Sequence, residues 1–213
     1  MEGILSYVID ALYSLPGILV GLSFHEWGHA YAAYKRGDPT ARNLGRMTVN
    51  PLAHIDPLGF LSLLILGFGW AKPVPISTRN FKTPRKDELI VSLAGITVNL
   101  ILGAVFMIIW AVLVSLPHSS EILNTMVQYC YAINFGLAVF NLLPIPPLDG
   151  YHVAQCLFMN GKTYRFFGFV EKYSYVILIA VLLINSRTHF LNTIVYWLML
   201  PLMKLAALIM GLF

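Results

Sequence analysis

Long runs of apolar residues constrain this chain of 213 residues more than any other feature, because a run of about 20 such residues can cross a hydrocarbon core of roughly 30 Å as a helix. Apolar residues make up 58% of the chain and charged residues only 11%, whereas average proteins carry about 25% charged residues. This composition excludes soluble, fibrous and disordered proteins and predicts an all-α polytopic membrane protein. We expect about five transmembrane helices, over Ile4–Tyr34, Leu89–Leu116, Ile122–Leu143, Tyr173–Ile184 and Leu191–Phe213. A short connector separates the last two runs and Pro201 interrupts the last one, so the predicted count holds to within one.

A further apolar run, Leu58–Trp70, is too short to cross a membrane as a helix. It has 13 residues, and three of them are glycines. We therefore expect a re-entrant segment that enters and leaves on the same side. The flanking charges agree, since four Lys or Arg residues precede the run within residues 35–46 and five follow it within residues 72–86.

The basic residues also predict the orientation of the chain. Of the 14 Lys and Arg residues, 12 lie in three loops, within residues 35–46, 72–86 and 162–172, which a five-span topology places on one face. Basic loops mark the cytoplasmic side, so we expect the N-terminus outside. The same topology explains the net charge of +4 without a nucleic-acid partner. We expect a single membrane-embedded domain over residues 1–213, in a bacterial or archaeal plasma membrane.

His25-Glu26-Trp27-Gly28-His29 forms an HExxH pattern near the cytoplasmic end of the first run. Residues four apart share a helix face, so His25 and His29 can present two imidazoles to one zinc ion while Glu26 acts beside it as a general base. A cluster of His and Glu inside a membrane is costly to insert, so a functional site explains it better than helix packing does. The pattern predicts one Zn²⁺ per chain.

Catalytic zinc usually has three protein ligands, so a third residue has to join the two histidines. Asp149 is a candidate because three prolines before it end the third span at the depth of the histidines, and Gly150 relieves the backbone. A turn on the membrane surface is the alternative for this segment. The other candidates near the membrane edge are Asp10, His54, Asp56, Glu121 and His152, of which Asp10 and Glu121 lie too far away.

Two segments resemble the site-2 protease family of intramembrane zinc metalloproteases: FHEWGHA at residues 24–30 and NLLPIPPLDG at residues 141–150. Their order, their spacing and their placement on separate spans are similar to the family, as is LAGITVNL at residues 93–100. The resemblance implies a zinc endopeptidase in which His25, His29 and Asp149 bind the metal and Glu26 is the catalytic base. It also implies hydrolysis within or next to transmembrane segments of membrane-protein substrates. The chain resembles a minimal form of the family, without PDZ or CBS domains.

Three further residues are candidates for binding substrate or stabilising an oxyanion: Asn141, Asn99 and His54. Interhelical hydrogen bonding is the alternative role for both asparagines, and capping of a turn is the alternative for His54. A substrate has to unwind before its carbonyl can reach zinc, so we expect a short edge strand at residues 45–50 that pairs with it by β-addition. A plain ordered loop is the alternative for that stretch.

A metal-binding or metal-transporting membrane protein without proteolytic activity is the alternative function. It could use the same His-His-Asp cluster, but it would have no need of Glu26. The expected partners of a protease are transmembrane protein substrates and the lipid bilayer. Gly17 and Gly21 form a GxxxG pattern for which internal helix packing is the favoured interpretation, and contact between copies in a homo-oligomer is the alternative.

Overall fold

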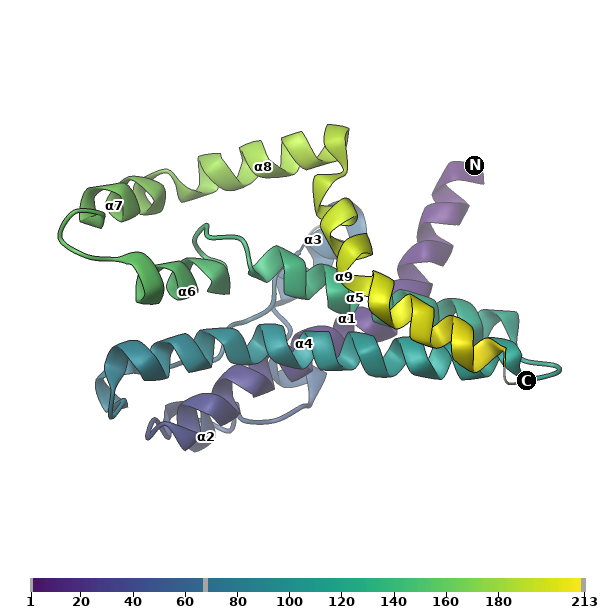
Figure 1. The fold of residues 1–213 in the computed structure, drawn as a ribbon, viewed down its shortest axis with the longest axis horizontal. Helices are drawn as coiled ribbons and strands as arrows, with labels where there is room; N and C mark the ends of the chain where they lie inside the picture. Colours follow the sequence, from purple (N-terminus) through teal and green to yellow (C-terminus); the bar gives the residue numbers. More distant parts are fainter. Residues whose placement is uncertain (1, 67–68, 212–213) are drawn as a thin grey trace.

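The computed structural model describes residues 2–66 and 69–211, and this part of the chain is helical with irregular connections (Figure 1). Its α-helices are α1 (Glu2–Lys35), α2 (Thr40–Asn43), α3 (Pro57–Leu66), α4 (Pro84–Ser115), α5 (Glu121–Asn141), α6 (Asp149–Phe158), α7 (Tyr164–Lys172), α8 (Ser174–Thr188) and α9 (Phe190–Met210). Two short 3-10 helices, η1 (Pro51–Ala53) and η2 (Thr78–Asn80), lie between α1 and α4. The prediction of an all-α chain is confirmed for these residues.

Four helices are long and apolar enough to cross a membrane: α1 over Leu5–Lys35, α4, α5 and α9. Helices α7 and α8 could form a fifth span only as a pair, and they are bent by 74° at the break between them. The predicted run Tyr173–Ile184 falls largely in α8, whose 15 residues extend about 22 Å and are too few to cross alone. The protein is an integral membrane protein with four candidate spans in its described part, and the predicted count of about five is not confirmed.

Helix α4 is central to the bundle, with α1, α5, α6 and α9 packed against it (Figure 1). Small residues allow α1 and α5 to approach closely. A methyl group added at Gly17 would lie 2.9 Å from the Cα atom of Cys130, and one added at Gly21 would lie 2.9 Å from a methyl group of Leu137. Gly17 and Gly21 therefore serve packing within the chain, as the favoured interpretation of the GxxxG pattern predicted.

The short apolar run after η1 folds as a helix whose two flanks lie together. Helix α3 has 10 residues, or about 15 Å, which is half the thickness of a hydrocarbon core. On the return, Ala71 pairs with Ile55 in an isolated antiparallel bridge, and the Lys72 N–H donates to the His54 carbonyl at 2.8 Å. This is the arrangement that a re-entrant segment requires. Residues 67 and 68 of the predicted run lie outside the described part of the chain.

The predicted edge strand at residues 45–50 is wrong, because the structure has turns and bends there. Gly45 adopts a left-handed conformation with φ 68°, which ends any extended run. Side chains then bond to the local backbone, since the Asn50 N–H donates to Thr48 Oγ1 and Asn50 Oδ1 accepts from Leu52 N–H as the cap of η1. These local hydrogen bonds compete with strand pairing. The ordered loop considered as the alternative is the observed structure.

Candidate metal centre

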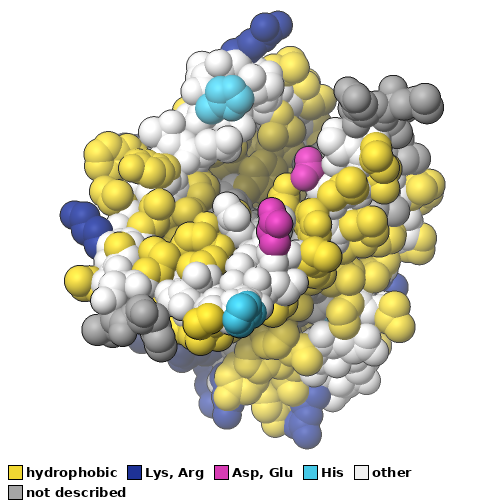
Figure 2. Space-filling view, turned by 90° about the vertical axis from the view of Figure 1, so that its right-hand side faces the viewer, with side chains coloured by type: hydrophobic (Ala, Val, Ile, Leu, Met, Phe, Trp, Pro, Cys, Tyr) yellow, Lys and Arg dark blue, Asp and Glu magenta, His cyan; other side chains and the backbone are white. Residues whose placement is uncertain are grey.

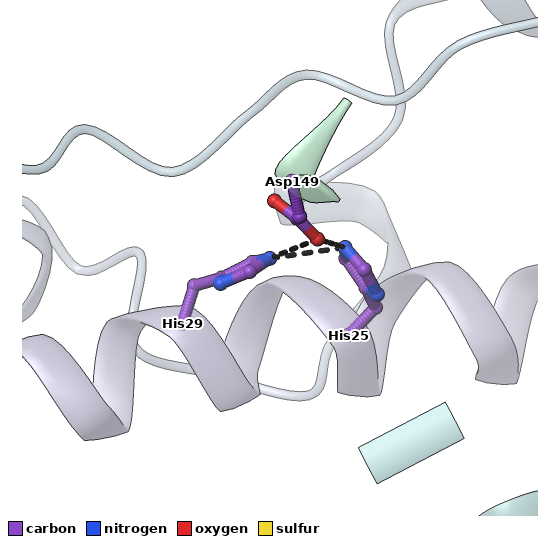
Figure 3. A group of neighbouring side chains, drawn as sticks. All are labelled: His25, His29 and Asp149. Carbon is purple, nitrogen blue, oxygen red and sulfur yellow. Dashed lines mark hydrogen bonds and ion pairs between the residues drawn. The ribbon is translucent and has the colours of Figure 1, made fainter. Parts of the chain in front are cut away.

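His25 and His29 lie one turn apart on the buried face of α1, and both point towards the start of α6 (Figure 3). Each is 6% exposed, and their Nε2 atoms are 3.0 Å apart. The two imidazoles meet because residues i and i+4 lie above one another on a helix.

Asp149 completes the group from α6. Its Oδ2 atom is 3.1 Å from Nε2 of His25 and 3.2 Å from Nε2 of His29 (Figure 3). Gly150 makes this approach possible, because a methyl group there would lie 2.2 Å from the carbonyl oxygen of Leu142 at the end of α5. The proline-rich turn thus brings the start of α6 close to the end of α5, α6 packs against α4, and the carboxylate lies next to the two histidines.

Hydrogen bonds behind the rings determine which imidazole nitrogens carry protons. Nδ1 of His29 is 2.8 Å from the Val91 carbonyl oxygen, and a carbonyl can only accept, so Nδ1 is the protonated atom. Nδ1 of His25 is 2.6 Å from Oδ1 of Asn99. The amide of Asn99 is oriented by its Nδ2, which donates to the Gly21 carbonyl and to Oδ1 of Asn134, each at 3.0 Å. In the neutral rings both Nε2 atoms therefore keep a lone pair directed at Asp149.

The Nε2 atoms of His25 and His29 and the Oδ2 atom of Asp149 are chemically suited to bind a zinc ion. Three electron-pair donors face one another at 3.0–3.2 Å, and in the neutral rings no proton lies between them. Oδ2 of Asp149 is buried without any hydrogen-bond donor. The lone pairs of these three atoms repel one another unless a cation lies between them. Tetrahedral zinc sites with nitrogen and oxygen ligands have ligand separations of about 3.3 Å, close to those seen here.

Gly95 of α4 allows the two histidines to pack against that helix. A methyl group added at Gly95 would lie 2.4 Å from Nε2 of His29 and 2.7 Å from Cε1 of His25. Asn99 lies one turn further along the same face of α4. Two residues of the LAGITVNL segment are therefore explained by their contact with the imidazoles, one through its lack of a side chain and the other through its hydrogen bond.

Glu26 lies beside the three candidate metal ligands, and a hydrogen bond holds its carboxylate in place. It is 9% exposed, and its Oε2 atom accepts a hydrogen bond from the Val74 N–H at 2.7 Å. A cavity of about 370 Å³ opens next to this group, and its lining includes His25, Glu26, His29, Val74, Asn141 and Asp149. Glu26 and the three candidate metal ligands thus share one cavity, which we call the metal cavity.

The non-helical segment 71–77 lines the metal cavity through Pro73, Val74 and Ile76, which the sequence did not predict. Arg46 donates to the Lys72 carbonyl at 2.8 Å, and Asp38 accepts from the Ser77 N–H at 2.8 Å. A signal was present in Pro73-Val74-Pro75, since proline forces the residue before it into an extended conformation and leaves Val74 with the only N–H among the three.

Asp38 is the buried anchor of this segment. It is 0% exposed, and besides Ser77 it accepts from Nδ2 of Asn80 at 2.7 Å and from the Thr40 N–H at 3.1 Å. Burial opposes its ionisation, but the hydrogen bonds from Thr40, Ser77 and Asn80 hold the pKa of Asp38 below its ordinary value. The end of α1 and the segment over the metal cavity are therefore joined through one carboxylate.

The remaining candidate residues lie in different places. Asn141 lines the metal cavity and donates to the Leu137 carbonyl at 3.0 Å. Asn99 is 0% exposed and lies behind His25, where it forms the interhelical bonds considered as its alternative role. His54 is 2% exposed and lines a second cavity. His152 lines the metal cavity, with Nδ1 3.4 Å from Oε1 of Glu88.

Comparison with known proteins agrees with this chemistry. Residues 115–185, which include Asp149, match the profile of peptidase family M50. YwhC of Bacillus subtilis is 36% identical over 187 residues, 85% of this chain and 85% of that protein. Rip2 of Mycolicibacterium smegmatis is 29% identical over 198 residues, 91% and 75% of the two chains, and MJ0611 of Methanocaldococcus jannaschii is 34% identical over 149 residues, 70% and 72%.

All three relatives carry names that describe zinc metalloproteases. No solved structure matches the chain. Three side chains, His25, His29 and Asp149, have the geometry to hold a metal ion. The identity to YwhC over most of both sequences shows that the chain belongs to peptidase family M50, the site-2 protease family, and is a zinc metalloprotease.

Proposed function

We propose that the protein hydrolyses peptide bonds within or next to the transmembrane segments of membrane-protein substrates. The observation that supports this most is the position of the metal centre inside an apolar helix. Glu26 lies nine residues, or about 14 Å, before the end of the candidate span Leu5–Lys35. A peptide that reaches this site has to enter a region that lipid surrounds.

In this proposal His25, His29 and Asp149 hold one zinc ion, which is supported by the close approach of their three ligand atoms within the described part of the chain. Bound zinc supplies Lewis acidity, polarising the scissile carbonyl and lowering the pKa of water to about 7. Glu26 accepts the proton of the attacking water and returns it to the leaving amine. The Val74 N–H keeps one carboxylate oxygen of Glu26 in place during both transfers.

The substrate has to be extended where it is cut, because a helix hides its carbonyl groups and is about 10 Å wide. Asn141 lies at the edge of the metal cavity, and one N–H of its amide is used by the Leu137 carbonyl. Its other N–H and its Oδ1 are suited to the backbone of an unwound peptide. We therefore assign Asn141 to substrate binding.

The metal cavity faces the cytoplasm in the proposed orientation. The C-terminal end of α1, the N-terminal end of α4 and α7 lie at one end of the molecule (Figure 1). Together with the loops next to them in the sequence, within residues 35–46, 72–86 and 162–172, they carry 12 of the 14 Lys and Arg residues. The opposite end, which carries both termini, presents mainly hydrophobic side chains with Lys and Arg at its edges (Figure 2). By the rule that basic loops stay inside, water reaches the site from the cytoplasmic side and the N-terminus lies outside.

The test is to measure zinc content and cleavage in one detergent preparation of the wild type and of Glu26→Gln, with a panel of single-span membrane proteins as substrates. We expect about one zinc per chain in both proteins and cleavage by the wild type alone. Cleavage by Glu26→Gln would remove that residue as the base. Zinc binding without cleavage of any panel member by the wild type would favour a metal-binding or metal-transporting protein.

A further inference from the structure

A second cavity, of about 120 Å³, lies between α1, α5 and two stretches of the chain, residues 51–63, which include part of α3, and residues 69–71. We call it the side cavity. Its walls are mainly apolar and include Leu19, Leu22, Phe60, Leu63, Ile133 and Leu137. An apolar cavity of about 150 Å³ accommodates benzene, so this space suits one aliphatic side chain.

The side cavity adjoins the metal centre along α1. Leu22 lines it and lies four residues before Glu26, so the two share a helix face about 6 Å apart along the axis. Ala71 also lines it and precedes Val74, which contacts Glu26, by three residues. An extended peptide advances about 3.3 Å per residue. A substrate residue about two positions from the cut bond can therefore reach the side cavity while the bond lies at Glu26.

His54 lines the side cavity, and one of its ring nitrogens has no hydrogen-bond partner. Its Nε2 atom is 2.8 Å from the Thr48 carbonyl oxygen, which can only accept, so Nε2 carries the proton. Nδ1 then has a free lone pair, and it is buried with no hydrogen-bond partner. A buried acceptor without a donor is unfavourable. The occupant should therefore bring an N–H or O–H group as well as an apolar body.

These properties distinguish among possible occupants. A helix about 10 Å wide is too large for 120 Å³. A lipid acyl chain is apolar but has no hydrogen to donate to His54. An unwound peptide has both features, an apolar side chain and a free backbone N–H.

We propose that the side cavity is a specificity pocket that binds one aliphatic side chain of the substrate near the cut bond, with His54 Nδ1 accepting a hydrogen bond from a backbone N–H of the substrate. This inference rests on the proposed proteolytic function. It adds the class of residue that the substrate must carry beside the cleavage site.

The first test changes the size of the pocket at Leu19. Substrates with Ala, Leu or Phe at each position around the cut bond are compared by kcat/KM. We expect the wild type to favour Leu at one position, Leu19→Ala to shift the preference towards Phe by about tenfold, and Leu19→Phe to shift it towards Ala by a similar factor. Leu12, also on α1 but 58% exposed, supplies matched controls in which Leu12→Ala and Leu12→Phe leave the preference unchanged.

The second test removes the proposed hydrogen bond between the substrate and His54, first by changing the donor on the substrate and then by changing the acceptor on the protein. A synthetic substrate with an ester in place of the amide at the preferred position lacks the N–H, and we expect the wild type to cleave it about tenfold more slowly. His54→Phe should slow cleavage of the amide substrate by a similar factor and should show no further loss with the ester. Independent losses that multiply would remove His54 as the acceptor. The ester comparison needs no variant and stands even if His54→Phe fails to fold.

A third measurement detects occupancy without cleavage. In the Glu26→Gln background, Leu19→Cys should form a disulfide with a substrate that carries Cys at the preferred position, whereas Leu12→Cys should not. Cleavage by the wild type with no change of preference in either Leu19 variant would overturn the specificity pocket and leave the protease assignment intact. Failure of the wild type to cleave any substrate would overturn both. An acyl chain that copurifies in the side cavity and is not displaced by substrate would assign the cavity to lipid and overturn the proposal.

Discussion

Nδ1 of His25 donates to Oδ1 of Asn99 at 2.6 Å, which joins α1 to α4 directly behind the metal centre. Asn99 is itself held by Asn134 of α5, whose Nδ2 donates to the Cys130 carbonyl at 2.8 Å. The orientation of one metal ligand therefore depends on the packing of three helices. Outer hydrogen bonds of this kind fix the tautomer and the ring plane of a metal-binding histidine.

Replacing Asn99 with Ala should weaken zinc binding while leaving the fold in place. Loss of such an outer partner typically lowers metal affinity by about 10-fold to 100-fold. Zinc affinity is measured by competition with a chelator, and folding by thermal unfolding in detergent. Thr97→Ala on the exposed side of α4 is the control. Unchanged zinc affinity in Asn99→Ala, with reduced cleavage, would point instead to a direct role in substrate binding.

Gly95→Ala should prevent the histidines from binding zinc. The added methyl group would lie 2.4 Å from Nε2 of His29, so the ring or the whole of α4 has to move. Overpacking of this kind destabilises a protein by about 1 to 3 kcal/mol, and we expect zinc affinity to fall by more than 100-fold. Gly136→Ala is a matched control in α5, because no atom lies within 4 Å of a methyl group there. Full zinc occupancy in Gly95→Ala would show that α1 and α4 are further apart than described.

The sequence predicted those parts of the site that depend on residues close together in the chain, and it did not predict contacts between distant helices. His25, His29 and Glu26 could be placed because helix geometry brings residues i and i+4 together. Asp149 was a candidate because of the prolines before it, with a turn on the membrane surface as the alternative, and the resemblance to the family implied its role as a ligand. The local sequence did not show whether Asn99 bonds to a substrate or to His25. Its contact with His25 depends on which faces of α1 and α4 meet.

One expectation about the fold is wrong and another is not confirmed. The strand expected at residues 45–50 rested on alternating residues, but Gly45 and the side chain of Asn50 direct the backbone into turns. The run expected to span at Tyr173–Ile184 begins at the bend of 74° between α7 and α8, so it is a span only if this bent pair crosses as one. An apolar or alternating pattern does not reveal a local turn or bend of this kind.

Val74→Pro should slow cleavage without releasing zinc. Proline keeps the extended backbone between Pro73 and Pro75 but removes the N–H that donates to Glu26. A carboxylate that loses this partner is less well placed to accept and return a proton. We expect kcat to fall by about 10-fold to 100-fold, with KM little changed. Val74→Ala, which keeps the N–H, should retain most of the activity, and an unchanged kcat in Val74→Pro would remove this role of Val74.

Removing zinc should destabilise the protein, because three lone pairs would then face one another without a cation. A ligand present at 1,000 times its Kd stabilises the folded state by about 4 kcal/mol. We expect a chelator to lower the Tm of the wild type and added zinc to restore it. Asp149→Ala should show neither response, whereas Asn141→Ala should respond like the wild type. A Tm that is insensitive to chelation in a preparation shown to lose its zinc would contradict a stabilising role for the metal.

Asp38 should make stability depend on acid pH. Its pKa in the folded protein lies below the ordinary value, which is about 3.9. The stabilisation is therefore fully present above that ordinary value and is lost as the pH falls through the folded pKa. Asp38→Asn should lower the free energy of unfolding at pH 7 by about 1 to 3 kcal/mol, because buried N–H donors lose a charged acceptor.

The same variant should also reduce cleavage, because the segment that carries Val74 is anchored through the bond from the Ser77 N–H to Asp38. Thermal unfolding in detergent between pH 3 and pH 7 measures the effect on stability, whereas the effect on cleavage is measured by the cleavage assay. The wild type should lose stability at the acid end and converge on Asp38→Asn, and Glu121→Gln, a change at an exposed carboxylate, should follow the wild type throughout. Parallel curves for the wild type and Asp38→Asn over the whole range would show that the charge of Asp38 does not hold the segment over the metal cavity.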